Sequence, residues 1–209
     1  MTKFIIFDFD GTIVETWNLT IKIANRLSEE FGYKKINQKN AQKLRNYKTQ
    51  EILRTVGLPL LKLPFWVKRV RKEANKEIEF AKPVSGIKTA LSELKKNKYN
   101  LAIITSNTKE NVNNFLRKNN LDFFDFIYSG SSVFGKSKII NKLLKEKNLS
   151  LDQTIFVGDE TRDIEAARKS KVKIIAVSWG FNSKEILKKQ KPDFLINKPK
   201  ELFAILKKF

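Results

Sequence analysis

Five short apolar segments, each followed by a polar element, constrain the fold of this chain more than any other feature. They occupy residues 4–7, 101–104, 154–157, 173–177 and 194–196. Segments with helical periodicity alternate with them, at residues 84–96, 109–119 and 136–147. Apolar strands that alternate with helices predict a parallel sheet in a doubly wound α/β fold. Ligands of such a fold bind beyond the carboxyl ends of the strands.

The stretch from about residue 15 to residue 81 interrupts this alternation. It contains no convincing strand, but it contains amphipathic helical stripes, one of which includes Ile21, Ala24 and Leu27. A later stripe, from Val67 to Ala81, could also belong to a core helix of a single domain. An uninterrupted helical block favours a separate small domain. We therefore expect a helical domain at residues 15–82, inserted into a core of residues 1–14 and 83–209.

The first apolar segment ends in two carboxylates, Asp8 and Asp10, followed by Gly11 and Thr12. Alternation along an extended chain directs both carboxylates to one side, where they repel each other unless a cation lies between them. A carboxylate at a strand end can attack phosphorus, and its neighbour can exchange protons with the leaving group and with water. The alternative is a simple turn, because Asp-Gly is a common turn pair.

A second pair of carboxylates, Asp159 and Asp163, follows the strand predicted at residues 154–157. Their spacing of four on the first turn of a helix allows both to face one ion. An N-cap with a favourable charge at the helix start would also explain this segment by itself. It would not explain why two such turns lie at the same predicted edge of the sheet.

Two weaker signals lie between these pairs. Thr105 and Ser106 follow the strand at residues 101–104, where a hydroxyl and exposed amides suit a phosphate oxygen, although an N-cap is the ordinary interpretation. Lys136 lies in a Gly-Lys-Ser-Lys sequence just before a helix, and a surface lysine is the ordinary interpretation there.

Taken in order, these segments resemble the four motifs of the haloacid dehalogenase-like phosphatases, and the loop at residues 177–183 resembles phosphoglycolate phosphatase-like members. The resemblance implies a Rossmann-like core with a mobile helical cap after the first strand. It also implies a role for each motif residue. Asp8 would be the nucleophile and Asp10 the general acid and base, while Thr105, Ser106 and Lys136 would bind the phosphate. Asp8, Asp10 and Asp159 would bind a metal ion, and Asp163 would support the metal shell.

The third motif departs from the family pattern. The motif lysine is commonly preceded by glycine and followed by proline, but Ser137 occupies the proline position here. Lys136 and Lys138 therefore both remain candidates, and Gly135 together with the helix register favours Lys136.

Composition narrows the chemistry further. The chain has no cysteine and no histidine, which excludes disulfides, thiolate zinc sites and every cysteine or histidine mechanism. Carboxylate oxygens are ligands for a hard metal, so we expect Mg2+ as the cofactor.

The function that follows is a magnesium-dependent phosphomonoester hydrolase that forms an aspartyl-phosphate on a small phosphorylated metabolite, best represented by 2-phosphoglycolate. A β-phosphoglucomutase-like phosphotransferase and a nucleotide or pyrophosphate phosphatase are the alternatives. Dehalogenase activity is disfavoured, because that branch lacks the second aspartate of the first motif. Arg45, in a polar break of the inserted block, is a candidate for gripping a substrate carboxylate, although it could be an ordinary exposed arginine.

The net charge of +20 raises a different possibility, a basic nucleic-acid-binding module that uses residues 62–76. The lysines are spread along the whole chain, and four intact motifs indicate an enzyme, so nucleic acid is not expected as a partner. No apolar run reaches transmembrane length, and a strand begins too early for a signal peptide. We expect a cytoplasmic protein without a membrane partner, as a monomer or weak homodimer.

Overall fold

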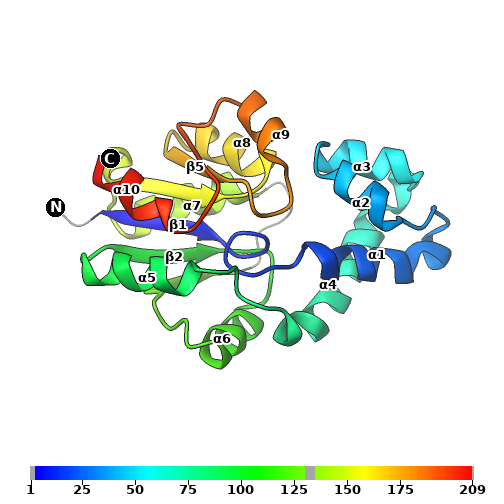
Figure 1. Cartoon of the computed structure of the whole chain (residues 1–209), viewed down its shortest axis with the longest axis horizontal. Helices are drawn as coiled ribbons and strands as arrows, with labels where there is room; N and C mark the ends of the chain where they lie inside the picture. The colour runs from blue at the N-terminus through cyan, green and yellow to red at the C-terminus, as the bar shows by residue number, and fades with distance from the viewer. Residues whose placement is uncertain (1–2, 130–134, 209) are drawn as a thin grey trace.

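The computed structural model describes residues 3–129 and 135–208. Their centre is a parallel sheet with the strand order β3-β2-β1-β4-β5-β6 (Figure 1). The strands are β1 (Phe4–Asp8), β2 (Asn100–Ile104), β3 (Phe126–Tyr128), β4 (Thr154–Gly158), β5 (Lys173–Val177) and β6 (Phe194–Ile196). This confirms the predicted α/β class. Strand β3 was not predicted from the sequence; it is a three-residue edge strand that is only half buried.

Helices surround this sheet and fill the segment between β1 and α5. They are α1 (Trp17–Phe31), α2 (Gln38–Leu44), α3 (Thr49–Val56), α4 (Leu63–Glu77), α5 (Ile87–Lys96), α6 (Lys109–Lys118), α7 (Lys136–Glu146), α8 (Thr161–Lys169), α9 (Lys184–Lys189) and α10 (Glu201–Lys208), with short 3-10 turns η1 (Leu60–Lys62), η2 (Ile78–Phe80) and η3 (Leu151–Gln153). Within the described residues, no helix combines the length and apolarity needed to cross a bilayer.

Side-chain alternation along β1 divides the core into two layers. Ile5 and Phe7 pack in one cluster with side chains of α5, α6 and α10. Phe4 and Ile6 pack in the other, with side chains of α7, α8 and α9. Burial on both faces explains why this strand is apolar at every position. The same alternation directs Asp8 toward the side of the sheet that α7 and α8 cover.

Strand register brings the polar residues of three strands to one edge. Asp8 pairs with Ile104 at the end of β2, and Phe7 pairs with Val157 near the end of β4. Asp8, Thr105 and Asp159 therefore leave neighbouring strands side by side, as expected for the carboxyl edge of a parallel sheet.

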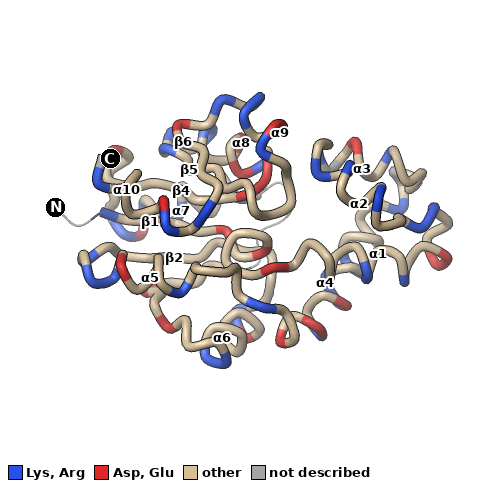
Figure 2. Tube along the Cα trace, viewed as in Figure 1, with Lys and Arg blue, Asp and Glu red and all other residues tan. Residues whose placement is uncertain are grey.

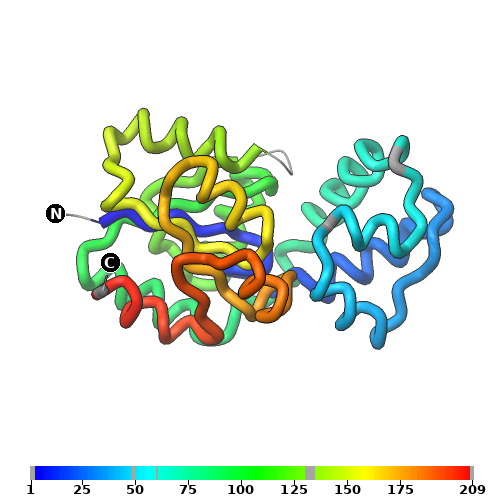
Figure 3. Tube along the Cα trace, turned by 90° about the horizontal axis from the view of Figure 1, so that it is seen from above, coloured from blue at the N-terminus to red at the C-terminus, as the bar shows by residue number. Residues whose placement is uncertain are grey.

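The helices α1–α4 form a separate layer beside this edge, which we call the helical insert (Figures 1 and 3). The chain enters and leaves it along paired segments, where Glu15 N donates to Lys82 O at 2.9 Å and Val84 N donates to Ile13 O at 2.9 Å. Helix α4 packs against α1 but contains no fully buried residue, so its apolar side chains keep accessible surface. Figure 2 shows lysine and arginine distributed over both the core and the insert.

Candidate active site

Asp8 is the last residue of β1 and is 3% exposed. Its Oδ1 accepts a hydrogen bond from Phe9 N at 2.8 Å, and its Oδ2 lies 2.5 Å from Lys136 Nζ. Burial raises the pKa of Asp8, and the Lys136 ammonium acts in the opposite direction. A second cation beside this carboxylate would keep it ionised and therefore nucleophilic.

Lys136 is the first residue of α7 and lies between two carboxylates. Its Nζ is also 2.6 Å from Asp163 Oδ1, and the residue is 6% exposed. Burial lowers the pKa of Lys136, but the charges of Asp163 and Asp8 outweigh it and hold the pKa above its ordinary value. Lys138 is exposed. The structure thus brings Lys136, of the two candidates, to the carboxylates.

Asp159 follows β4 and is fully buried. Thr12 Oγ1 donates to its Oδ1 at 2.7 Å, and Phe181 N donates to its Oδ2 at 2.7 Å. Burial raises the pKa of Asp159, and the neighbouring Asp8 and Glu160 carboxylates raise it further. Gly11 lies against this carboxylate in the left-handed region, with φ 78°, and a Cβ there would collide with Asp159.

Asp163 shapes the turn before α8. Its Oδ2 accepts hydrogen bonds from Asp159 N at 3.1 Å and Glu160 N at 3.0 Å, while its Oδ1 holds Lys136. This carboxylate therefore fixes the backbone next to Asp159 and the position of the lysine at the same time.

The carboxylates of Asp8, Asp159 and Asp163 form a buried acidic cluster, with one oxygen from each within 4.8 Å of the others. Three buried anions against the ammonium of Lys136 leave an excess of negative charge that a divalent cation would balance. An all-oxygen set fits a hard cation. Asp10, which is expected at the metal through its main-chain carbonyl, contributes no carboxylate oxygen to this cluster.

Asp10 lies in the turn after β1, where its half-buried side chain lines a cavity between the core and the insert. Burial raises the pKa of Asp10, and Lys136 opposes the increase. A raised pKa suits a carboxyl group that must hold a proton before it donates one.

Thr105 and Ser106 follow β2 at the same edge. Thr105 is fully buried, and its Oγ1 accepts from Asn107 N at 3.0 Å, which leaves its own hydroxyl hydrogen available for a phosphate oxygen. Ser106 lines the cavity that Asp10 also lines.

Arg45 lies outside this cavity's lining and connects the insert to the core. Its Nη2 donates to Gly180 O at 2.6 Å and to Ser178 O at 3.3 Å, and Ser183 N donates to Arg45 O at 2.8 Å. Asn182 extends the connection, because its Oδ1 accepts from Thr161 N at 2.9 Å and its Nδ2 donates to Tyr47 O at 3.1 Å. We call these contacts the insert latch.

The cavity between the core and the insert has a volume of about 240 Å³, and we call it the insert cavity. Two arginines that were not predicted as site residues line it, Arg71 of α4 and Arg162 of α8. Burial lowers the pKa of Arg71, and the charge of Arg162 lowers it further, so the two cations act on each other. Arg162 could have been noticed between Asp159 and Asp163, whereas Arg71 is one of many basic residues in its segment.

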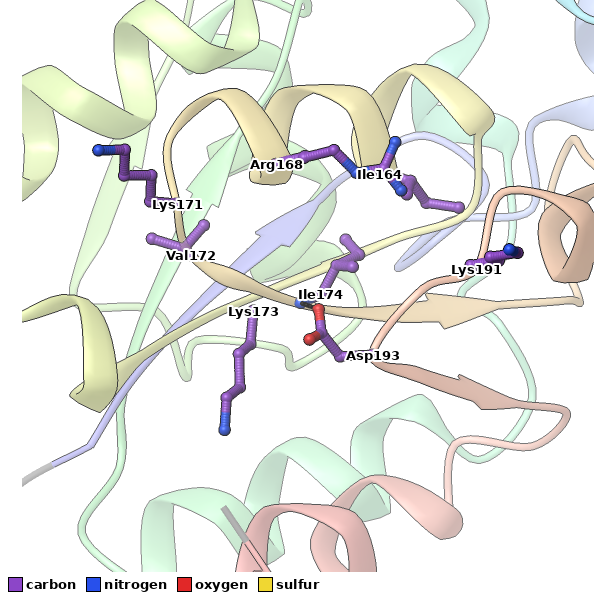
Figure 4. Close-up of a pocket in the computed structure, with 8 residues that line it drawn as sticks. All are labelled: Ile164, Arg168, Lys171, Val172, Lys173, Ile174, Lys191 and Asp193. Atoms are coloured by element: carbon purple, nitrogen blue, oxygen red, sulfur yellow. Dashed lines mark hydrogen bonds between the residues drawn. The ribbon is translucent and has the colours of Figure 1, made fainter.

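A second cavity, of about 290 Å³, lies by the amino end of β5, and Figure 4 shows the residues that line it. None of the three residues of the acidic cluster belongs to this lining. The cavity is lined by basic residues of α8 and its neighbours, but Figure 4 shows Lys171 and Lys173 pointing in different directions. Asp193 Oδ2 accepts from Ile174 N at 2.9 Å. Without convergent donors, this cavity is a poor candidate for a binding site.

Known proteins share both the sequence pattern and the fold. The family model for haloacid dehalogenase-like hydrolases matches residues 5–177. A phosphoglycolate phosphatase of Synechococcus elongatus is 31% identical over 199 residues, which cover 95% of this chain and 94% of the relative. A pyrophosphatase PpaX of Bacillus mycoides is 25% identical, with 97% of this chain and 95% of the relative covered. The structure of a haloacid dehalogenase-like hydrolase from Streptococcus pneumoniae superposes with a TM-score of 0.80 at 26% identity, with 98% of each chain covered.

Proposed function

Because the chain belongs to the haloacid dehalogenase-like hydrolase family and its relatives are phosphatases, we propose that it hydrolyses a small phosphomonoester through a phosphorylated Asp8. The observation that supports this most directly is the buried Asp8 carboxylate, held 2.5 Å from Lys136 Nζ beside Asp159 and Asp163. A nucleophile, an ammonium and further carboxylates are thereby concentrated at one strand end.

In the first step, a carboxylate oxygen of Asp8 attacks phosphorus. A bond forms between Asp8 and phosphorus, the ester P–O bond breaks, and Asp10 gives its proton to the departing oxygen. Burial raises the pKa of Asp10, which favours the protonated form that this step needs. Lys136 and the Thr105 hydroxyl stabilise the negative charge on the phosphoryl oxygens.

In the second step, Asp10 acts as a base. Its carboxylate takes a proton from water, the water oxygen attacks phosphorus, and the Asp8–phosphorus bond breaks to release inorganic phosphate. Lys136 again stabilises the charge on the phosphoryl group, and Asp163 keeps the ammonium in place.

Mg2+ is the proposed cofactor, held by the carboxylates of Asp8 and Asp159 and by the main-chain carbonyl of Asp10. When bound, it would neutralise charge on the carboxylates and on the phosphoryl group. Asp163 would support this shell through the backbone of Asp159. The excess of buried carboxylates over ammonium groups supports this assignment.

The proposed substrate class is a phosphomonoester with a second anionic group, of which 2-phosphoglycolate is the simplest example. The phosphoglycolate phosphatase relative supports this choice. Arg71 and Arg162 also line the cavity next to Asp10, and Arg162 pairs there with Glu160, so a substrate anion would share this arginine with the Glu160 carboxylate. Inorganic pyrophosphate also carries a second anion, and the PpaX relative makes it the second candidate.

The test is phosphate release from a panel of 2-phosphoglycolate, inorganic pyrophosphate, nucleotides and β-glucose 1-phosphate, with and without magnesium. We expect the largest kcat/KM for 2-phosphoglycolate. Formation of glucose 6-phosphate without phosphate release would support the phosphotransferase alternative. Absence of turnover on the whole panel would contradict the proposed substrate class.

A further inference from the structure

The lining of the insert cavity is mainly apolar, whereas 2-phosphoglycolate is a polar molecule. Asp10, Ser106 and Arg162 line it from the core. The lining from the insert is mainly apolar and includes Trp17, Ile21, Ile52, Val56, Trp66 and Val67. One continuous space therefore joins the proposed general acid to an apolar interior.

Helix α4 contributes partly exposed apolar side chains to this space, and Trp66 and Val70 also pack against the core of the insert. None of its residues is fully buried, although it packs along α1. Trp66, Val67 and Val70 are only half buried, and all three line the cavity. An apolar cavity of roughly 150 Å³ already holds benzene. The insert cavity, at about 240 Å³, has room for a group of that size beside a polar one.

The same cavity contains donors that have no acceptor. Among the described residues, Trp17 Nε1 and Arg162 Nε are buried nitrogen atoms without a hydrogen-bond partner, and both residues line the cavity. A buried donor without an acceptor is costly. Oxygen atoms of a leaving group would satisfy these donors if they lay between the ester oxygen and the apolar interior.

We propose that the insert cavity binds an apolar substituent of the leaving group, so that the preferred substrate is a phosphorylated 2-hydroxy acid with a branched or aromatic side chain. The inference rests on the proposed function and deepens it. The phosphoryl group lies at Asp8, the carboxylate lies near Arg162 and Arg71, and the side chain enters the space between Trp17, Trp66 and Val67.

The first experiment compares three substrates that differ only in the substituent: 2-phosphoglycolate, 2-phospholactate and 2-phosphonooxy-3-phenylpropanoate. Each buried CH₂ is worth about fourfold in affinity. We therefore expect kcat/KM to rise from the first ester to the third by roughly tenfold or more. Equal values for all three, or a loss with the phenyl group, would overturn the inference and leave the proposed function intact.

The second experiment fills the cavity. Val67→Phe places a ring inside it, and Lys68→Phe adds the same ring on an exposed position of the same helix. We expect Val67→Phe to lower the ratio of kcat/KM for the phenyl ester to kcat/KM for 2-phosphoglycolate to about one or less, because the new ring occupies the space that the substrate ring needs. Lys68→Phe should keep the higher kcat/KM for the phenyl ester. If both variants kept the higher kcat/KM for the phenyl ester, the insert cavity would not be the binding site of the apolar substituent.

A binding measurement tests the apolar subsite independently of the proposed catalytic mechanism. Calorimetry with the Asp8→Asn protein and magnesium compares methylphosphonate with benzylphosphonate, neither of which requires catalysis. Tighter binding of benzylphosphonate, lost in the Asp8→Asn, Val67→Phe double variant, would support the apolar subsite even if the enzyme turned over poorly. Equal affinity for the two phosphonates would overturn the inference. Absence of turnover by the unmodified enzyme on the three esters and on the whole panel described above would overturn the proposed function itself.

Discussion

At the scale of single residues, the negative charge of Asp8 is the quantity on which the proposed chemistry depends. Its carboxylate is buried, lies 2.5 Å from Lys136 Nζ and belongs to the acidic cluster. An amide in its place would keep the shape and remove the nucleophile, so the effect of charge can be separated from the effect of packing.

We expect Asp8→Asn to lower kcat by on the order of 10³ or more, because the amide cannot form the phosphorylated intermediate. Phosphate release from 2-phosphoglycolate measures this, and circular dichroism checks the fold. Asp152→Asn, at an exposed position, is the matched control and should retain activity. Near-normal turnover by a folded Asp8→Asn protein would contradict the covalent mechanism.

A second prediction at this scale concerns Gly11, which has φ 78° and lies against the Asp159 carboxylate. Gly11→Ala should destabilise the protein by roughly 1–3 kcal/mol and lower activity strongly, because the new Cβ displaces Asp159. Thermal unfolding and phosphatase assays measure the two effects.

The control for this prediction isolates backbone strain. Gly57 has nearly the same conformation, with φ 80°, and an added Cβ meets no atom within 4 Å there. Gly57→Ala should therefore lose some stability and retain activity. Equal losses of activity in the two variants would show that the collision with Asp159 is unimportant.

At the scale of elements, the insert latch connects the α2–α3 segment to the loop that holds Asp159. Arg45 and Asn182 bind across this boundary, and Phe181 N in the same loop donates to Asp159 Oδ2. We propose that residues 15–82 move as a cap, and that closing the latch and ordering the Asp159 carboxylate occur together.

The latch changes what we expect of Arg45. If the guanidinium bound the substrate carboxylate, Arg45→Ala would raise the KM for 2-phosphoglycolate alone. If Arg45 instead holds the insert latch closed, the substitution would lower kcat/KM for every substrate. We expect Arg45→Ala to lower kcat/KM by about tenfold on both 2-phosphoglycolate and a simple aryl phosphate, because charge-assisted hydrogen bonds are lost. Arg54→Ala, at an exposed position of α3, is the control. A loss confined to 2-phosphoglycolate would restore Arg45 as the substrate contact.

Helix α4 carries much of the basic charge that suggested nucleic-acid binding. Arg69 pairs with Glu73 and Glu30, and Lys76 pairs with Glu73, so acidic neighbours neutralise part of the helix. We expect any affinity for duplex or single-stranded DNA to be weak and to disappear near physiological salt. Fluorescence anisotropy over a salt series measures it. Tight, sequence-selective binding at that salt would favour the nucleic-acid alternative.

At the scale of the whole molecule, the acidic cluster joins β1, β4 and α8 at one edge of the sheet, so a bound cation would act on both activity and stability. Excess chelator should abolish phosphate release and added magnesium should restore it, whereas calcium should inhibit because its larger, more flexible shell suits the site less well. Magnesium should also raise Tm, because it binds the folded state. Full activity in excess chelator would contradict the metal proposal.

The sequence by itself determined the fold class of this protein, and it did so through local patterns. A strand that is apolar at every position, such as residues 4–7, must be covered on both faces of the sheet, and the helices between the strands are long and periodic. It also located the carboxylates, because Asp8, Asp10, Asp159 and Asp163 lie next to strand ends. The edge strand β3 escaped detection because it is short and half buried, so its hydrophobic pattern is weak.

Only the tertiary structure decided how side chains from distant segments combine. It placed Lys136 between Asp8 and Asp163, and it brought Arg71 to the cavity next to Arg162. Local hydrophobic periodicity does not predict contacts between distant segments, and Lys136 and Asp163 lie 27 positions apart in the sequence. The shape and polarity of the insert cavity likewise arise only when the helices pack against the core, because a half-buried apolar residue looks the same in sequence as a buried one.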